Sequence, residues 1–534
     1  MEFQLNIFKV FYNEILLINK TKIMNHFLRI FFILSLFLVS CSDDNEIDRA
    51  YQAKETISLK KNTTATIQSK STQFQQIELL NDPIFQTGFN VLEPTTGVIQ
   101  GSLQYTSANG SPQWNLTQWY SSSSIYGSSP TILSSGSYQF ADSNKAITIG
   151  PSTSSDGNLI FALNGFNDFN GVYRGASDPF PHLLADQRIA DPDGWLGTST
   201  PFIGEMSSLD FSIDALLQYH VRNQQSGYNP AIHALQYNCV FLIQNLRQGN
   251  SGYGKNMYFM STLFDDRYPV PSQNIQIDLF TGKFIYDVGL IPFSSTGLTV
   301  GTWKTISGDL LPLIKNALNE AWGRGILTES TLLSDYKVSM FTTGFECSGL
   351  NIGTMQIKNL ILTAHQTVDY DLNVYNTVNI GNDIWMVENF KSTHFNDGSP
   401  ITINYHPNDP THIYGPSYSW NDIVKPSFVP AGWHVATDVE WQALYDYVAG
   451  DGNKLKETGT DHWNTANGTN ETGFTAFGSA HIYGAALKAE GTWWAATEND
   501  AINGLRWSIF DNGGMWRGAN DKNMFFPVRL VKNK

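Results

Sequence analysis

Apolar and polar residues alternate in short segments over a long middle part of the chain, from about residue 76 to 366. Alternation with a period of two is the pattern of a β-strand that buries one face. The clearest segments are LIFALNGF, LDFSIDALLQYHV, LQYNCVFLIQNL, NMYFMSTLF, IQIDLF, YKVSMFTTGF and MQIKNLILTA. The segment DLLPLIKNALNEAW has helical spacing instead, with Asp309 placed to cap the helix. Many strands and a single helix predict a β-sandwich that is jelly-roll-like.

The pattern changes after about residue 374, where loops rich in Trp and Gly replace the regular strands. The segments VNIGNDIWMVENFKSTHFNDGSPI, IYGPSYSW, PAGWHVATDVEWQAL, GNKLKETGTDHWNT, TNETGFTAFGSA and GTWWAATEND follow in order, and the chain ends near MFFPVRLVK. Together they resemble the Fibrobacter succinogenes major paralogous domain (FISUMP). The resemblance implies a small α+β, C-type-lectin-like fold on a secreted or surface protein, and it implies no catalytic activity. Family members often carry two cysteines where this chain has Val429 and Leu530, so packing is expected to replace that disulfide.

The stretch PAGWHVATDVEWQAL places His434, Asp438 and Glu440 close together in a way that could suggest an active site. However, Thr437 to Glu440 fits the capping box S/T-x-x-E, which is found where a helix begins. Asp438 falls in the first turn, where the helix dipole favours negative charge. The pattern therefore predicts a helix start, and we interpret His434 as a hydrogen-bonded structural residue.

The N-terminal region has the features of a bacterial lipoprotein. After Met24, which we take as the true start, an apolar run of secretory type ends in Leu-Val-Ser-Cys at Cys41. This ending resembles a lipobox, so Cys41 is the predicted lipidation site, and a membrane is a predicted partner through the lipid anchor. The following SDDNE resembles the acidic signal of Bacteroidetes lipoproteins, which predicts an outer-membrane, surface-exposed protein. The predicted parts are a signal region (1–41), a tether (42–75), the sandwich (76–366) and the FISUMP domain (367–534).

Composition narrows the range of partners. The 534 residues carry a formal net charge of −15, and only 15% of them are charged. A polyanion requires a basic surface, and the chain has no Lys/Arg stripe, so nucleic acid is not an expected partner. Besides Cys41, the chain contains Cys239 and Cys347, for which a disulfide and two buried thiols are equally compatible with the sequence.

Aromatic side chains supply candidates for sugar binding, since the CH groups of a pyranose pack flat on a ring. In outline the β-region resembles carbohydrate-binding modules of jelly-roll type. The candidate stacking residues are Trp114, Trp119, Tyr120, Trp195 and Trp494.

Glu498, Asn499 and Asp500 form a polar cluster of the kind that coordinates calcium in C-type lectins. The lectin signatures E-P-N and W-N-D are absent, so calcium is a hypothesis, and no other cofactor is expected.

These observations favour a non-catalytic binding role at the cell surface, with a glycan or a surface protein as partner. A glycosidase needs two carboxylates about 5 Å or about 6.5–9.5 Å apart, and the β-region has no E-x-D run that would build such a pair on one strand. The alternatives are a surface glycoside hydrolase or polysaccharide lyase that uses acids from distant strands, and a structural part of a protein assembly on the outer membrane.

Overall fold

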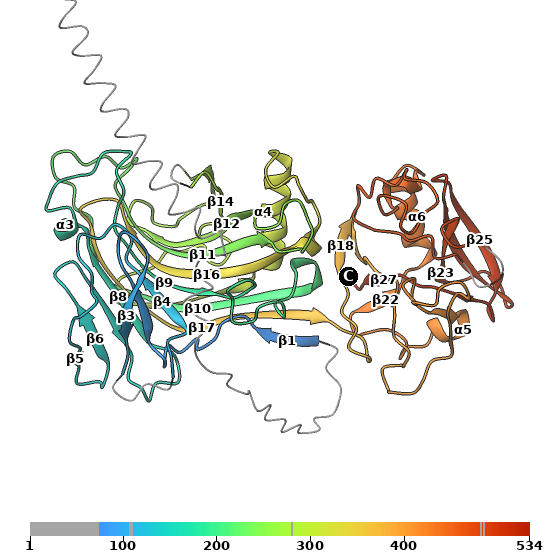
Figure 1. The fold of residues 1–534 in the computed structure, drawn as a ribbon, viewed down its shortest axis with the longest axis horizontal. Coiled ribbons are helices and arrows are strands. Elements are labelled where there is room, and N and C mark those ends of the chain that lie inside the picture. The colour runs from blue at the N-terminus through green and yellow to red at the C-terminus, as the bar shows by residue number, and fades with distance from the viewer. Residues whose placement is uncertain (1–73, 106–109, 279–280, 481–482, 484–485) are drawn as a thin grey trace, which may run out of the picture. The chain divides into compact units, whose positions relative to one another are not determined.

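A computed structural model describes residues 74–105, 110–278, 281–480, 483 and 486–534 (Figure 1). The predicted lipidation site, Cys41, and nearly all of the predicted tether lie outside these residues. Within the described ranges, no helix has both the length and the apolar character needed to span a membrane.

The first of two large sheets has eight strands in the order β15-β10-β17-β8-β7-β6-β5, with β1 also paired to β17. Its strands are β1 (Phe74–Glu78), β5 (Thr131–Ile132), β6 (Tyr138–Ala141), β7 (Lys145–Ile149), β8 (Leu159–Asn164), β10 (Met206–Val221), β15 (Trp303–Asp309) and β17 (Ile352–Thr367). Strand β1 begins two residues before the predicted start of the sandwich, and β17 ends one residue after its predicted end.

The second large sheet has nine strands in the order β13-β14-β12-β11-β16-β9-β4-β2-β3. Its strands are β2 (Phe89–Leu92), β3 (Ile99–Leu103), β4 (Trp114–Thr117), β9 (His182–Arg188), β11 (Leu235–Asn245), β12 (Asn256–Asp265), β13 (Asn274–Ile277), β14 (Phe284–Asp287) and β16 (Tyr336–Cys347). Neighbouring strands are antiparallel except for the pairs β12–β14 and β2–β4.

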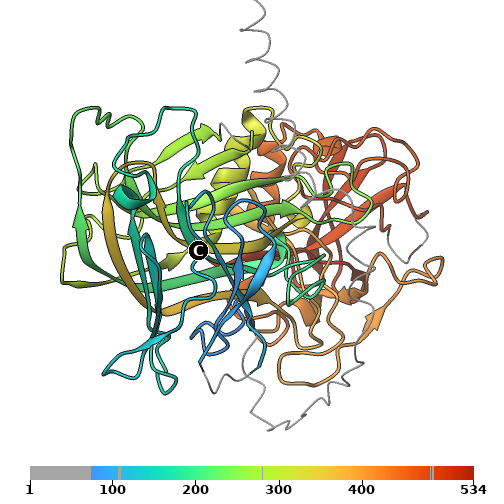
Figure 2. The ribbon, with the colours of Figure 1, turned by 60° about the vertical axis from the view of Figure 1, so that its left-hand side comes forward.

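The two sheets pack face to face, and their long strands run next to each other in both ribbon views (Figures 1 and 2). Aromatic rings from the two layers meet in one hydrophobic core. Phe161 of β8 contacts Tyr237 of β11 at 5.7 Å between ring centroids, and Phe211 of β10 contacts Phe241 of β11 at 5.5 Å. This packing confirms the predicted β-sandwich.

Two α-helices and two short 3-10 turns accompany the sandwich: α3 (Gly165–Asp168), α4 (Leu311–Gly323), Ile203–Glu205 and Leu333–Asp335. The long helix α4 is the predicted one, but its N-cap residue is Leu310 and not Asp309. The Asp309 carboxylate still accepts hydrogen bonds from the backbone N–H groups of Leu311 and Leu209, both at 2.9 Å.

The C-terminal domain consists of three small sheets, two helices and a 3-10 turn. The sheets are β18 (Thr377–Ile380), β19 (Asp383–Met386), β27 (Leu530–Lys532) and β22 (Trp433–Val435); β20 (Ile403–Asn404), β21 (Ser417–Ser419) and β26 (Phe525–Phe526); and β23 (Glu490–Glu498), β24 (Asn503–Phe510) and β25 (Met515–Asp521). The helices are α5 (Trp420–Ile423) and α6 (Asp438–Tyr447), and the turn is Gly452–Lys454. The chain is therefore mainly β, with a jelly-roll-like sandwich followed by a smaller α+β domain, as predicted.

Helix α6 begins where the capping box predicts. The Thr437 hydroxyl accepts from the Glu440 N–H, and the Glu440 carboxylate accepts from the Thr437 N–H at 2.8 Å. His434 lies between Glu440 and Asn533, at 2.7 Å from an oxygen of each. Asp438 accepts from Arg517 and Trp507 at 2.7–2.9 Å. All of these polar groups have hydrogen-bond partners within the fold, which agrees with the structural interpretation of this stretch.

The two positions where the family often has cysteines carry packing residues, as expected. Leu530 is fully buried in a cluster around Phe428 and Tyr418, and Val429 packs against the same cluster. Cys239 and Cys347 are free thiols, fully buried in the sandwich. Burial raises the pKa of both thiols to about 12, so neither is reactive in the folded protein.

Candidate ligand-binding face

The nine-stranded sheet turns one face to the core and the other away from it. In β11, Tyr237, Cys239 and Phe241 are fully buried in the core. Gln236 and Asn238 alternate with them and therefore point to the opposite side of the sheet. We call this second side the outer face.

Strand register aligns polar side chains across the outer face in three rows. The first row contains Asn90, Asn115, Asp186, Thr342, Val240, Met260 and Asp287. The second contains Thr117, Leu184, Gly344, Asn238 and Thr262. The third contains His182, Glu346, Gln236 and Asp265. We call these the polar rows. They bring amide, carboxylate and hydroxyl groups from seven of the nine strands onto one surface.

Asp186 lies near the middle of the polar rows and has few partners for its charge. Its side chain is buried, and among the described residues it accepts one side-chain hydrogen bond, from Asn115 Nδ2 at 3.1 Å. Burial raises the pKa of Asp186 to about 6, and neither Asn115 nor the nearby charge of Arg188 offsets this. An ionised carboxylate at this place destabilises the fold, so its presence calls for a role beyond packing.

Asn238 lies in the second row and is 1% exposed. Its Oδ1 accepts from the Thr262 hydroxyl at 2.9 Å, whereas its Nδ2 has no hydrogen-bond partner among the described residues. The same hydroxyl oxygen lies 2.6 Å from Asp287, so its single proton is shared between two acceptors, and burial raises the pKa of Asp287. A buried amide donor without a partner costs about 1–3 kcal/mol.

Aromatic rings surround His182 at the end of the third row. The Phe180 ring lies 4.7 Å from the imidazole of His182, nearly perpendicular to it, and the Tyr120 ring lies 6.2 Å away. The predicted stacking residue Tyr120 therefore lies beside the polar rows. Trp119, its neighbour, is half-buried and covers Gly97, where a Cβ atom would come within 2.3 Å of the indole.

Two of the predicted stacking residues are wrong. Trp114 alternates with Asn115 in β4, so it points into the sandwich core and is fully buried. Trp494 is fully buried as well, because both faces of β23 are covered: Trp493 packs in one hydrophobic cluster and Trp494 in another. Trp195 is 41% exposed, and its Nε1 donates to the Leu79 carbonyl at 2.8 Å, so its role in stacking stays a prediction.

The predicted calcium cluster forms the exposed tip of the β23–β24 hairpin. Asp500 accepts from the N–H groups of Ile502 and Asn503 at 2.8 Å and from Asn499 Nδ2 at 2.7 Å, and the Glu498 carboxylate pairs with Lys522. The hydrogen bonds from Asn503 and its neighbours hold the pKa of Asp500 well below its usual range. The described ranges contain no group of three or more His, Cys, Asp or Glu side chains that could hold a metal ion. In this structure Asp500 stabilises the turn, and calcium binding stays a prediction.

The polar rows were not identified from the sequence. Asp186 and Asn238 stand out in HLLADQR and LQYNCVFLI only as polar residues at every second position of a strand. That signal marks an outward-facing position. The rows themselves depend on register between strands up to about 160 residues apart in the chain.

Residues 378–532 match the family model of the Fibrobacter succinogenes major domain, which confirms the resemblance of the C-terminal segments. No curated protein matches the chain.

Several solved structures are similar to this chain at low identity. Endoglucanase Cel12A from Rhodothermus marinus is 12% identical, and the match covers 45% of this chain and 97% of that one, with a TM-score of 0.25. A family 12 xyloglucanase from Bacillus licheniformis is 13% identical over 44% of this chain and 97% of its own length, with a TM-score of 0.27. The xyloglucanase domain of NopAA from Sinorhizobium fredii is 10% identical over 46% and 98%, with a TM-score of 0.24. Likenesses at these scores say nothing about the activity of this chain.

Proposed function

We propose that this protein binds polysaccharide at the cell surface through the outer face of the nine-stranded sheet, and that it does not cleave its ligand. The observation that carries the proposal is the set of polar rows, in which hydrogen-bonding groups from seven strands share one surface. Sugar hydroxyls are both donors and acceptors, so a face of carboxylate, amide and hydroxyl groups is suited to them. The rings of Tyr120 and Phe180 beside His182 supply apolar surface at one end.

Asp186 and Asn238 have complementary needs. The Asp186 carboxylate has unused acceptor capacity, and the Asn238 amide has an unused donor. In the proposed complex, the side chains that cover these two buried groups shift, so that hydroxyl groups of a chain of sugar rings reach both. In this proposal, ligand hydroxyls replace partners that the fold itself does not provide.

The arrangement of acids favours binding over hydrolysis. Asp186 of β9 and Asp287 of β14 are four strand spacings apart, or roughly 19 Å, which is too far for a catalytic pair. Glu346 and Asp265 share the third row, two strands apart. However, Asp265 is buried and forms an ion pair with Arg267 at 2.6 Å and a hydrogen bond with Gln236 at 2.9 Å. Its charge is therefore already used within the fold.

The surface location in this proposal has two supports. The C-terminal domain matches the model of the Fibrobacter succinogenes major domain, and this resemblance implies a secreted or surface protein. The segment ending at Cys41 resembles a lipobox, which would hold the protein on the outer membrane.

The test is a glycan-array screen of the purified protein with and without calcium, followed by incubation with each bound glycan and analysis of its length. We expect binding with intact glycan. Asp186→Asn and Asn238→Ala should each weaken binding about tenfold or more. Gln218→Ala, on β10 of the other sheet, is the matched control and should bind as the wild type does.

Other outcomes would replace the proposal. Shortened or unsaturated glycan would establish the enzyme alternative, and Glu346 and Asp265 would be the first residues to substitute. Absence of binding to any glycan would favour the role in protein assembly. Loss of binding on removal of calcium would identify a metal requirement.

A further inference from the structure

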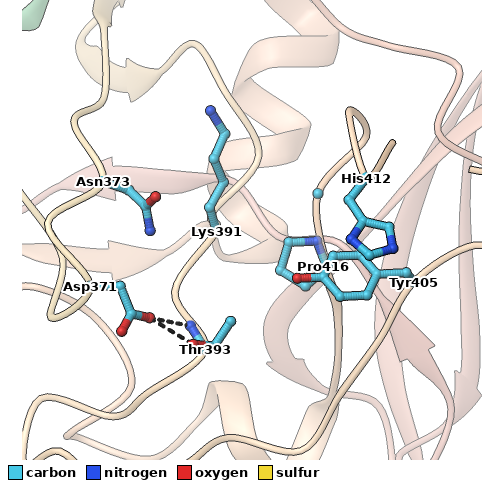
Figure 3. A pocket seen from close by; sticks show the side chains of 8 residues that line it. Asp371, Asn373, Lys391, Thr393, Tyr405, His412 and Pro416 are labelled. Atoms are coloured by element: carbon cyan, nitrogen blue, oxygen red, sulfur yellow. Dashed lines mark hydrogen bonds between the residues drawn. The ribbon is translucent and has the colours of Figure 1, made fainter. Parts of the chain in front are cut away.

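The C-terminal domain contains a pocket that the proposed function does not use. Its volume is about 280 Å³, which is enough for one ring with its substituents. The residues that line it are Asp371, Asn373, Lys391, Thr393, Tyr405, His412, Gly415 and Pro416. Figure 3 shows an aromatic side, with Tyr405 and His412, and a polar side, with Asp371 and Asn373.

The aromatic side is a stacked pair held by the loop before β21. The rings of Tyr405 and His412 lie 3.7 Å apart between centroids and are parallel within 5°. His412 has a backbone φ of 57°, which is unfavourable for a residue with a Cβ atom. The buried carboxylate of Asp409 holds this loop, since it accepts from Thr411, Ile413 and Tyr414 at 3.0–3.2 Å. The loop therefore maintains a strained conformation that keeps the two rings stacked at the pocket.

The polar side contains a carboxylate that is already satisfied. Asp371 accepts from the Thr393 N–H at 2.6 Å, from the Thr393 hydroxyl at 2.9 Å, from Ser392 at 3.1 Å and from His394 at 2.7 Å. Burial alone would raise the pKa of Asp371, but these hydrogen bonds outweigh it and lower the pKa below its ordinary value. Asp371 is thus an ionised structural group that needs no cation from a ligand.

Lys391 carries the charge that a ligand would meet. Its backbone N–H donates to the Tyr375 hydroxyl at 2.8 Å, whereas its ammonium group has no hydrogen bond or ion pair to any residue that the structure describes. Asn373 donates through Nδ2 to Asp369 at 2.8 Å, and its Oδ1 likewise has no partner among these residues. The pocket therefore offers one cation, one amide acceptor and one flat aromatic surface.

From this geometry we infer that the pocket binds a single acidic sugar, a uronic acid unit. The ring's CH groups would pack on the Tyr405 face, its carboxylate would pair with Lys391, and a hydroxyl would donate to Asn373 Oδ1. A neutral sugar would leave the Lys391 charge unpaired, so the pocket should discriminate by charge. This site is separate from the polar rows and does not depend on the proposed function.

The test is a ligand-observed NMR titration of the purified protein with both domains. The three probes are D-glucuronate, D-galacturonate and D-glucose. We expect saturable binding of at least one uronate and tenfold weaker or no binding of glucose. Lys391→Met should weaken uronate binding about tenfold or more, and Tyr405→Ala should have a similar effect. Tyr405→Phe keeps the ring and should stay within about twofold of the wild type.

Lys425→Met is the matched control, because Lys425 lies in the same domain and already pairs with Asp422 at 2.7 Å. It should bind uronate as the wild type does, as should Asp186→Asn, whose site is in the sandwich. Uronate binding that survives Lys391→Met, or glucose binding of equal strength, would overturn the inference. Absence of saturable binding for both uronates would also overturn it, whatever the result of the polysaccharide screen.

Discussion

Asp186 in the sandwich and Arg529 in the C-terminal domain are both buried charged side chains, and they differ in how many partners surround them. Arg529 is 1% exposed and donates to the carbonyls of Met386, Phe474 and Thr475 and to Asn389 Oδ1. Asp186 accepts a single side-chain bond. Burial shifts both groups toward the neutral form, lowering the pKa of Arg529 to about 9 and raising that of Asp186 to about 6.

The difference separates a buried charge that the fold satisfies from one that it leaves largely unsatisfied. Removing Arg529 would leave several buried acceptors without donors, so the side chain stabilises its domain. Removing the charge of Asp186 would relieve a penalty that the fold does not offset. Residues that destabilise a fold in this way are candidates for function. The following predictions test this contrast, from the largest expected effect to the smallest.

Arg529→Met should lower the free energy of unfolding of the C-terminal domain by about 3 kcal/mol or more, because the carbonyls of Met386, Phe474 and Thr475 lose the donor that Arg529 provides. Urea unfolding followed by tryptophan fluorescence measures this loss. Arg517→Met is the control, since Arg517 is exposed and pairs with Asp438 at the surface, and its loss should stay below about 1 kcal/mol. Equal losses in the two variants would contradict the structural role of Arg529.

Asn389 and Asn238 form a matched pair of buried amides. Asn389 accepts from Arg529 and Trp493 and donates to the Tyr414 carbonyl, so Asn389→Leu should cost about 2–3 kcal/mol. Asn238→Leu removes a donor that has no partner and an acceptor that the Thr262 hydroxyl can replace with Asp287, so the variant should stay within about 1 kcal/mol of the wild type. Chemical unfolding of both variants measures the difference. A loss of 2 kcal/mol or more for Asn238→Leu would show that Asn238 is structural.

Asp186→Asn should stabilise the sandwich at neutral pH. A pKa raised from 3.8 to about 6 means that the folded state holds this proton more tightly than the unfolded state. The protonated Asp186 carboxyl therefore contributes to stability at low pH. This contribution, up to roughly 3 kcal/mol of unfolding free energy, is lost as the pH rises from about 4 through 6.

Unfolding curves of the wild type and Asp186→Asn at pH 4 and pH 7 check this sign. The variant should gain about 2 kcal/mol over the wild type at pH 7 and little at pH 4. A variant that is less stable at pH 7 would show that the ionised carboxylate has partners that stabilise it.

His434→Gln should have the smallest effect, below about 1 kcal/mol, because the imidazole is partly exposed to solvent. The hydrogen bond from His434 to Glu440 raises the pKa of His434. The stabilisation that protonated His434 provides is therefore lost as the pH rises through this raised pKa. The pKa of Glu440 is lowered: burial opposes this, but the hydrogen bonds from His434 and Thr437 outweigh it. The Glu440 contribution is therefore lost below about pH 4.5. The free energy of unfolding of the wild type, measured by urea unfolding, should therefore exceed that of the variant most between about pH 5 and 6.5. A difference that does not vary with pH would contradict the pairing.

Local patterns in the sequence identified the elements whose cause is local. The capping box at Thr437 and Glu440 specifies the start of α6 through contacts three residues apart. Alternation in LQYNCVFLI and YKVSMFTTGF specifies two strands because each buries one face. The ordered motifs of the C-terminal segments were specific enough to predict its family.

The candidate sites were harder to predict, because they depend on which segments meet. Trp114 and Trp494 have the composition of sugar-binding residues, but burial is decided by what packs on each strand face. The polar rows require the register of β9, β16, β11 and β12. The uronate pocket requires a loop to place His412 flat on Tyr405. No spacing in the sequence encodes these contacts.

The two buried thiols of the sandwich make its opening measurable. Cys239 and Cys347 lie on the neighbouring central strands β11 and β16, and both are inaccessible to reagents while these strands are packed. A maleimide or disulfide reagent would therefore label them only during transient opening, and the labelling rate would report the free energy of that opening under native conditions. Because the labelled residues sit directly beneath the polar rows, a polysaccharide held on the outer face should slow their modification. Under the proposed function, the labelling rate of these two thiols would therefore also report ligand occupancy.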